Sequence, residues 1–312
     1  MFCIVAFIIL AIFGIFSAGS RELAREAWGC VFRRVTFRPC TTGFDEKIKS
    51  RILGSVINRS ETAARLLNRN FELIAWAMFL IVTASSVYAV RGLYLFYVTG
   101  SCSGLNETSF CLLDPSGENS TVSAVDAGCR EKPTTVEDLT LKEADLRSFP
   151  TIKGKGEGSI VVIGCYGCAY TRRVYHSLKE LAERNGASFT FIDYPVKVKT
   201  NLMTRLGYCV YRQDPSRYWK LNETLFTAQL PTLDTLEGAR ATTAKLGLDW
   251  GEISRCLDAP ATRDAVDSQA EEALKTNFFG TPTVFINGKA FVGPKPDRVY
   301  AIALKGLAYW LK

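Results

Sequence analysis

Two long apolar stretches occur in the first hundred residues. Residues 2–18 form an unbroken apolar run, and residues 73–90 are uncharged and mainly apolar. Trp76 lies near one end of the second stretch, and Tyr94, Phe96 and Tyr97 follow its other end, as in the aromatic belts of membrane helices. A helix needs about 20 apolar residues to cross a bilayer. The pattern predicts two transmembrane helices, at about 2–18 and 73–98, in a membrane anchor that covers residues 1–99.

The segment between these stretches is strongly basic. It carries eleven Lys or Arg between positions 20 and 70, whereas none occurs between Arg91 and Arg130. Because cytoplasmic loops are enriched in Lys and Arg, we expect residues 19–70 to form a cytoplasmic loop and the chain after Val98 to be extracytoplasmic. A cleaved signal peptide would invert this topology, but only Met1 precedes the first apolar run, where a signal peptide carries basic residues. The predicted localisation is the cell membrane, with the C-terminal domain outside.

The remaining chain divides into a polar segment and a patterned segment. Residues 100–148 are rich in Gly, Ser, Thr, Asn and Asp and show little periodicity, which is typical of a linker. The globular domain is predicted at residues 149–312. Its expected elements are strands at 159–163 and 188–193, a helix at 168–184, a strand pair at 283–286 and 289–292, and a helix at about 297–311.

The order of these elements predicts an α/β fold. The Asn287-Gly288 dipeptide between two apolar runs is a strong hairpin signal, because both positions of that turn need positive φ. Strand, helix, strand, hairpin and helix is the order of a thioredoxin-like sheet, and a mainly helical stretch at about 199–275 interrupts it. The predicted fold class is therefore thioredoxin-like with a helical insertion, preceded by two transmembrane helices.

Net charge and histidine content exclude several functions. The net charge is +7, but the basic excess lies beside apolar segments, so it indicates membrane topology and we predict no nucleic-acid partner. His176 is the one histidine, which excludes His-rich zinc sites. It follows Cys165 by eleven positions, roughly 16 Å along one helix, so we interpret it as an ordinary helix residue.

The ten cysteines agree with a domain on the oxidising side of a membrane. The predicted topology leaves Cys30 and Cys40 on the reducing side, where we interpret them as reduced bystanders. It places an even number outside or at the outer interface, as a set of disulfides requires. These are Cys3, Cys102, Cys111, Cys129, Cys165, Cys168, Cys209 and Cys256. Cys102 with Cys111 is the most local pairing, which leaves Cys129 to pair with Cys3 or to remain a thiol.

The stretch from Cys165 to Cys168 is the candidate reactive centre. It follows a predicted buried strand and opens a predicted helix. The first thiol would lie at the helix N-terminus, where backbone N–H groups and the helix dipole stabilise a thiolate. The second would lie one turn on, where it can attack any mixed disulfide that the first forms. Two ordinary core cysteines, or half of a metal site, are the alternatives that these four residues leave open.

Three further motifs accompany this centre and resemble one family. GCYGCAYTRR, the pair LGYCVYRQDPSRYWKLNETLF and LGLDWGEISRCLD, and FFGTPTVFINGKAFVG together resemble the DsbA-like branch of the thioredoxin superfamily, over residues 149–312. The N-terminal motifs CVFRRVTFRPC and RGLYLFY to GSCSG resemble the membrane anchor that accompanies such domains in archaeal proteins.

The resemblance implies roles for individual residues. Cys165 matches the family's nucleophile and Cys168 its resolving thiol. Thr281 and Pro282 match the pair before and at a cis proline, where the loop offers backbone hydrogen bonds to an extended substrate. Cys209 and Cys256 resemble paired positions in relatives, which implies a structural disulfide.

Several positions depart from the family pattern. Tyr166 and Gly167 stand in place of the Pro-His of strongly oxidising members, and Ala169 stands where proline often follows the second cysteine. Thr281 replaces the valine common in dedicated oxidases. These departures leave oxidase, isomerase and reductase directions open.

The predicted function is that of a membrane-anchored thiol–disulfide oxidoreductase that acts on exported proteins. It would need no cofactor and no metal, although a membrane partner is expected to reset its redox state. One alternative is a non-catalytic domain in which Cys165, Cys168, Cys209 and Cys256 bind zinc; the 47-residue separation of the last two opposes it. Another is a chaperone or adaptor that binds unfolded chains through a thioredoxin-like groove.

Overall fold

The computed structural model describes residues 60–125, 135–196, 201–229 and 234–307, together with short stretches before residue 60. The chain divides into two units, Met1–Arg91 and Gly92–Lys312. Each unit is described by itself.

The first unit contains α4 (Glu61–Arg69) and most of α5 (Phe71–Thr99). At 29 residues α5 is about 44 Å long. Its apolar side chains, including Leu73, Ile81 and Val87, are exposed. In the part of the chain that the structure describes, α5 is the one helix long and apolar enough to cross a membrane. The transmembrane helix expected at 2–18 lies outside the described residues.

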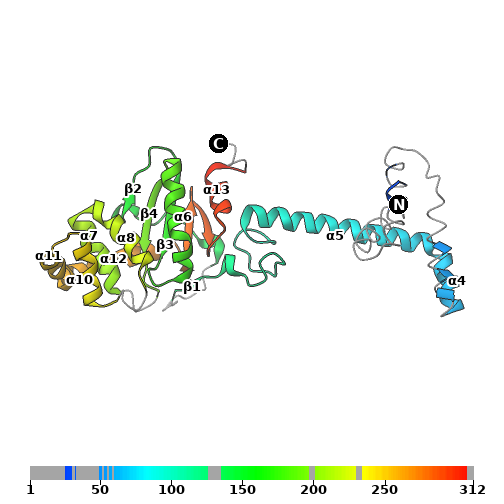
Figure 1. Cartoon of the computed structure of the whole chain (residues 1–312), viewed down its shortest axis with the longest axis horizontal. Helices are drawn as coiled ribbons and strands as arrows, with labels where there is room; N and C mark the ends of the chain where they lie inside the picture. Colours follow the sequence, from blue (N-terminus) through cyan, green and yellow to red (C-terminus); the bar gives the residue numbers. More distant parts are fainter. Residues whose placement is uncertain are drawn as a thin grey trace. The chain divides into compact units, whose positions relative to one another are not determined.

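The second unit is built around a five-stranded sheet in the order β2-β4-β3-β6-β7 (Figure 1). The strands are β2 (Thr151–Ile152), β3 (Ser159–Gly164), β4 (Ser188–Asp193), β6 (Thr283–Ile286) and β7 (Lys289–Val292). β3 and β4 are parallel, and the other neighbours are antiparallel. The predicted hairpin joins β6 to β7, with positive φ at both Asn287 and Gly288. β2 was not predicted, because two residues are too few to show a period.

Both faces of the sheet are buried, which explains the continuous apolar run of β3. Successive strand side chains point to opposite faces. Ile160 and Val162 pack in the larger core with the helices, whereas Val161 and Ile163 pack in a second core with Phe149 and Phe278. Apolar residues are therefore required at every position of this strand rather than at alternate ones.

Helices α6 (Ala169–Asn185) and α13 (Asp297–Lys305) pack against each other and against the central strands. Among the described residues between β4 and the last strands, five further helices occur where the helical insertion was expected. They are α7 (Asn201–Gln213), α8 (Pro215–Thr227), α10 (Leu236–Lys245), α11 (Trp250–Asp258) and α12 (Pro260–Leu274). The thioredoxin-like α/β fold that the element order predicted is thus the fold of this unit.

The prediction of a linker at 100–148 needs correction. Part of this segment belongs to the globular unit, which begins at Gly92. The amide of Asn106 pairs with the edge of β7: its Nδ2 donates to Ala290 O (3.0 Å) and its Oδ1 accepts from Val292 N (2.7 Å). Polar composition here reflects hydrogen bonds to the domain rather than mobility.

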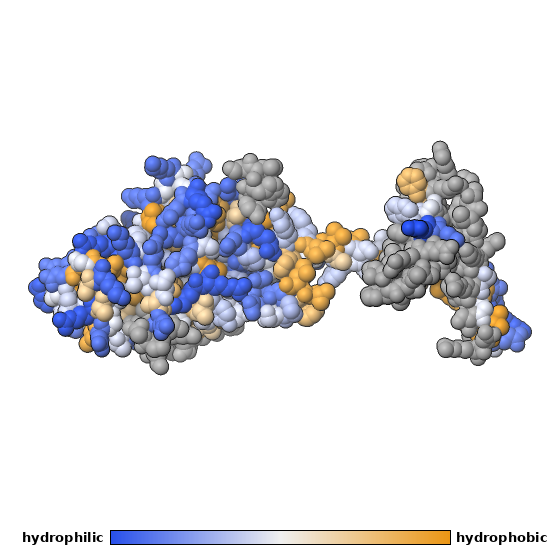
Figure 2. Space-filling model, in the orientation of Figure 1, coloured by the Kyte–Doolittle hydropathy of each residue, from blue (hydrophilic) through white to orange (hydrophobic). Residues whose placement is uncertain are grey.

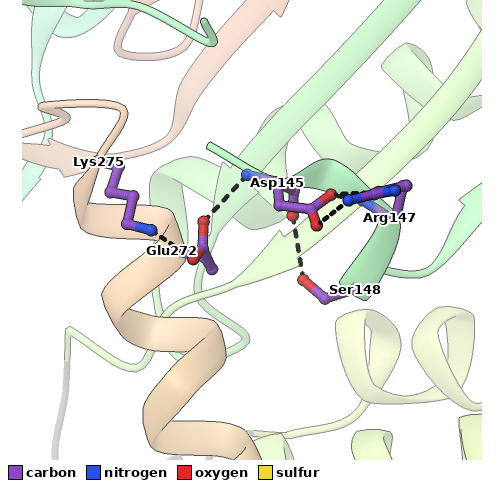
Figure 3. A network of polar contacts seen from close by, with 5 residues as sticks. All are labelled: Asp145, Arg147, Ser148, Glu272 and Lys275. Atoms are coloured by element: carbon purple, nitrogen blue, oxygen red, sulfur yellow. Dashed lines mark hydrogen bonds and ion pairs between the residues drawn. The ribbon is translucent and has the colours of Figure 1, made fainter. Parts of the chain in front are cut away.

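The second half of the segment is also attached. Asp145 donates its N–H to Glu272 Oε2 of α12 (3.0 Å), and its carboxylate accepts two hydrogen bonds from the Arg147 guanidinium (Figure 3). These bonds lower the pKa of Asp145 to about 2. In the same view Lys275 is paired with Glu272, so the network joins the segment to the end of α12.

Candidate active site

The two candidate thiols lie between the end of β3 and the start of α6. Cys168 is the N-cap residue of α6, and Cys165 precedes the helix in a turn closed by the bond from Cys168 N to Cys165 O (3.0 Å). The helix predicted at 168–184 begins one residue later, at Ala169, so both cysteines precede its first residue, whereas the second thiol was expected one turn on from a first thiol at the helix N-terminus. Gly164 permits this geometry, because a Cβ there would lie 2.4 Å from Thr171 Cγ2.

Cys168 lies in a polar environment although its side chain is buried. Its Sγ is 3.1 Å from Ser123 Oγ and 3.3 Å from the carbonyl oxygen of Thr281. Burial by itself raises the pKa of the thiol, but hydrogen bonds from the side chains of Ser123, Thr281 and Thr171 and from the Thr171 backbone outweigh it and lower the pKa of Cys168 below its usual value. The site therefore stabilises a thiolate at this position.

Cys165 has a cationic neighbour in Arg172. A negative charge on Cys165 raises the pKa of this guanidinium, although burial has the larger effect and lowers it. Arg172 is held by three carbonyl oxygens: Nε donates to Tyr166 O (2.7 Å), Nη1 to Ala228 O (2.8 Å) and Nη2 to Leu225 O (2.6 Å). The guanidinium of Arg172 is thus held in place on the first turn of α6 and interacts electrostatically with Cys165.

Tyr166, between the two cysteines, points into the core. Its side chain is fully buried, its ring packs against Phe191 and Phe226, and its hydroxyl donates to Asn222 of α8. Burial raises the pKa of Tyr166 well above its ordinary value, so the phenol stays protonated. Tyr166 therefore anchors the loop that carries the two cysteines to the core, and its side chain does not form part of the outer surface.

The Thr281-Pro282 pair lies beside Cys168. The peptide bond between the two residues is cis. Thr281 belongs to β5 (Gly280–Thr281), and its carbonyl accepts the bond from Cys168 described above. Pro282 O accepts from Gly293 N (2.9 Å). The structure thus brings together four of the residues singled out in the sequence: Cys165, Cys168, Thr281 and Pro282.

Cys209 and Cys256 form a disulfide that joins α7 to α11. Their sulfurs are therefore not available as thiolate ligands, which removes the four-cysteine zinc site considered as an alternative. Cys102 and Cys111 form a second disulfide, the most local of the pairings considered. Cys3, Cys30, Cys40 and Cys129 lie outside the described residues.

Sequence analysis missed three residues of the site. Thr171 and Arg172 lie on the first turn of α6, within a quoted motif, so their proximity to the thiols follows from helical geometry. Ser123 has no such signal, because it lies 45 positions from Cys168 in a segment without periodicity.

Asp193, at the end of β4, carries a buried carboxyl group close to the site. Its Oδ1 is shielded from solvent, and its Oδ2 accepts from the hydroxyl of Thr204. Burial raises the pKa of Asp193 to about 7, and hydrogen bonds from Thr204 and from the backbone of Tyr166 oppose this only in part. The carboxyl is thus linked to the loop that holds the cysteines.

This pKa predicts a pH dependence of stability. From about pH 4 to about pH 7 the unfolded chain has released the Asp193 proton while the folded protein retains it. The free energy of unfolding should therefore fall as pH rises through this range, by at most about 1.4 kcal/mol per pH unit. Urea unfolding of the purified protein should show this slope, and Asp193→Asn should reduce it. Asp258→Asn, at an exposed position, is the control; equal slopes in all three proteins would contradict the assignment.

The domain that holds this site is similar to known proteins. A family model described as a DSBA-like thioredoxin domain matches residues 141–305, more than half of the chain. Curated protein sequences yield no significant match. Among solved structures, a thioredoxin-like oxidoreductase from Silicibacter pomeroyi is 18% identical, with a TM-score of 0.45 over 50% of this chain and 90% of that one.

Two other similar structures have related descriptions. The thiol-disulfide exchange protein alpha-DsbA2 from Wolbachia pipientis is 16% identical, with a TM-score of 0.45 over 49% of this chain and 83% of its own. Oxidised BdbD from Bacillus subtilis is 20% identical, with a TM-score of 0.44 over 51% and 90% of the two chains.

Proposed function

This chain belongs to the DSBA-like thioredoxin family, and we propose that it is a membrane-anchored, extracytoplasmic thiol–disulfide oxidoreductase that forms or rearranges disulfides in exported proteins. The observation that carries the proposal is the contact between Cys168, in the Cys165–Cys168 pair, and the Thr281-Pro282 loop: Cys168 Sγ lies 3.3 Å from Thr281 O. In the proposed roles, Cys165 is the nucleophile, Cys168 is the resolving thiol, and the loop binds the substrate backbone.

The oxidising reaction needs only these two cysteines. A substrate thiolate attacks Cys165 in the Cys165–Cys168 disulfide; a substrate–Cys165 disulfide forms, and Cys168 leaves as a thiolate. A second substrate thiolate attacks the substrate sulfur, forms the substrate disulfide and releases Cys165. The substrate loses two electrons, and the pair becomes a dithiol. Rearrangement begins instead with Cys165 attacking a substrate disulfide, with Cys168 able to release the mixed disulfide.

The pair must be reoxidised after each oxidation. We propose a membrane-bound redox partner, because the anchor would hold the domain beside the bilayer. Recycling at a normal rate in membranes that lack any quinone-linked oxidase would count against this partner.

Two features support membrane attachment. Many apolar residues of α5 are exposed, and part of this apolar surface is visible in orange in Figure 2. Within the second unit, Phe110, Leu112 and Leu113 are also exposed, next to the disulfide that closes this loop. Both surfaces would be shielded from water in contact with lipid.

The topology can be tested with one introduced thiol. Ser116 is exposed in the segment after α5. Ser116→Cys in intact cells should react with a membrane-impermeant maleimide if the domain is extracytoplasmic. Protection in intact cells with labelling after lysis would place the domain in the cytoplasm.

The reduction potential of the Cys165–Cys168 pair tests the enzymatic proposal and its direction. The purified protein would be equilibrated with glutathione buffers, with Cys165→Ser as the control. A potential of about −120 to −180 mV is expected for a protein that donates or rearranges disulfides, whereas about −270 mV would indicate a reductase. The absence of any redox-active pair would overturn the proposal.

A further inference from the structure

Residues 120–125, which we call the strap, lie against the loop that ends in Pro282. Within the strap, β1 (Ser123–Ala124) pairs antiparallel with β5, Ser123 opposite Thr281 and Ala124 opposite Gly280. The pairing continues one residue further, where Val125 N donates to Phe279 O (3.0 Å). The backbone edge next to the cis peptide bond is therefore occupied by the chain's own strand.

Two glycines allow the strap to approach this closely. A Cβ on Gly280 would lie 2.5 Å from Val122 Cγ2 and 3.1 Å from Ser123 O. A Cβ on Gly293 would lie 2.8 Å from the carbonyl carbon of Ser120. The Val122 side chain thus occupies the space that a side chain at position 280 would need, and Gly293 lies directly against the strap backbone.

The strap also reaches Cys168, the proposed resolving thiol. Ser123 Oγ lies 3.1 Å from Cys168 Sγ, and both Cys165 and Cys168 are fully buried. Thiol–disulfide exchange requires a substrate sulfur to approach in line with a protein sulfur, so a buried pair cannot react without a movement.

The start of the strap and the residue before it are held by hydrogen bonds that do not involve β5. The Nζ of Lys295 donates to Ser120 Oγ (3.2 Å), and Asn119 Nδ2 donates to Gly100 O (3.1 Å). β1 itself has two residues, and Ala124 is exposed. Each neutral hydrogen bond contributes only about 1 kcal/mol, so the strand can separate from β5 while residues 117–120 stay in place.

From this geometry we propose that the strap occupies the backbone edge of β5 to which a substrate would bind. An extended substrate segment must displace the strap before it can reach the thiols. The inference rests on the proposed oxidoreductase function and adds its regulation. A tethered segment competes at an effective concentration of about millimolar, so only substrates that pair well with β5 would open the site. A substrate that replaces the strap would need a small residue opposite Gly280, as Ala124 is in the strap.

The strap can be weakened without changing either cysteine. Val125→Pro removes the N–H that donates to Phe279 O and cannot pair as a strand. Val125→Ala is the matched control, because it shortens the side chain and keeps the N–H. In the reduced, purified full-length protein, we expect Val125→Pro to raise the rate of Cys165 and Cys168 alkylation by iodoacetamide about tenfold, and Val125→Ala to change it less than twofold. Equal rates in Val125→Pro and the parent protein would overturn the proposal.

A second variant acts from the opposite side of the contact. Gly280→Ala places a methyl group against Val122 and should also raise the alkylation rate; it decides the question if Val125→Pro does not fold. Alkylation does not require catalysis, so this result is independent of the proposed function. With a reduced two-cysteine peptide as substrate, Val125→Pro should lower KM about tenfold at unchanged kcat. If Val125→Pro is alkylated faster but the parent protein does not oxidise the peptide, the proposal about the strap stands and the proposed oxidoreductase function is rejected.

Discussion

Replacing Cys165 with serine should reduce the catalysed oxidation of a reduced two-cysteine peptide to the uncatalysed rate. A serine hydroxyl cannot form a disulfide, so the variant has no bond that a substrate thiolate can attack. The remaining thiol, Cys168, cannot by itself store the two electrons of a dithiol–disulfide cycle. The measurement is the oxidation rate with oxidised glutathione as the final acceptor, at equal protein concentration and with unchanged circular dichroism.

Cys168→Ser is the matched variant and should behave differently. It keeps the proposed nucleophile and loses the resolving thiol. With two peptides joined by a disulfide as substrate, attack by Cys165 releases one peptide as a thiol and leaves a mixed disulfide between Cys165 and the other peptide, which Cys168 can no longer release; this adduct should accumulate and be visible by mass spectrometry. If the mixed disulfide accumulates in Cys165→Ser instead, the roles of the two cysteines are reversed. That result would agree with the hydrogen bonds that lower the pKa of Cys168. Full activity in Cys165→Ser would favour a chaperone or adaptor.

Removing the disulfide between α7 and α11 should cause the largest loss of stability. Cys209 and Cys256 are separated by 47 residues. The chain-entropy relation for a loop of this length gives about 4 kcal/mol. The double variant Cys209→Ser/Cys256→Ser should lower the free energy of unfolding by about this amount in urea titrations, because the unfolded chain regains the freedom that the crosslink removes.

The second disulfide provides a comparison within the same chain. Cys102 and Cys111 are separated by nine residues, for which the same relation gives about 2.5 kcal/mol. Cys102→Ser/Cys111→Ser should therefore cost less than the α7–α11 pair. A loss below about 1 kcal/mol for Cys209→Ser/Cys256→Ser would contradict an entropic contribution of this size.

Most strands of the sheet and the helices that pack on it could be predicted from local patterns in the sequence. The strands at 188–193, 283–286 and 289–292 occur at their predicted bounds, and β3 extends one residue beyond its prediction. These segments are long or strongly apolar, and the hairpin has the Asn-Gly turn that its backbone requires. β2 and β1 were not predictable, because each has two residues and exists only through its partner strand.

For the candidate site, the sequence by itself determined which residues can do the chemistry. Two cysteines separated by two residues, between a strand and a helix, are suited to thiol exchange, and the accompanying motifs favoured this chemistry over a metal site. The tertiary structure decided what surrounds them. Ser123 reaches Cys168 because the strap folds back onto β5. Arg172 is fixed near Cys165 by carbonyl groups of α8, some 50 residues away in the chain. Such contacts depend on how distant segments pack, and polar residues in an irregular segment have no period from which that packing could be predicted.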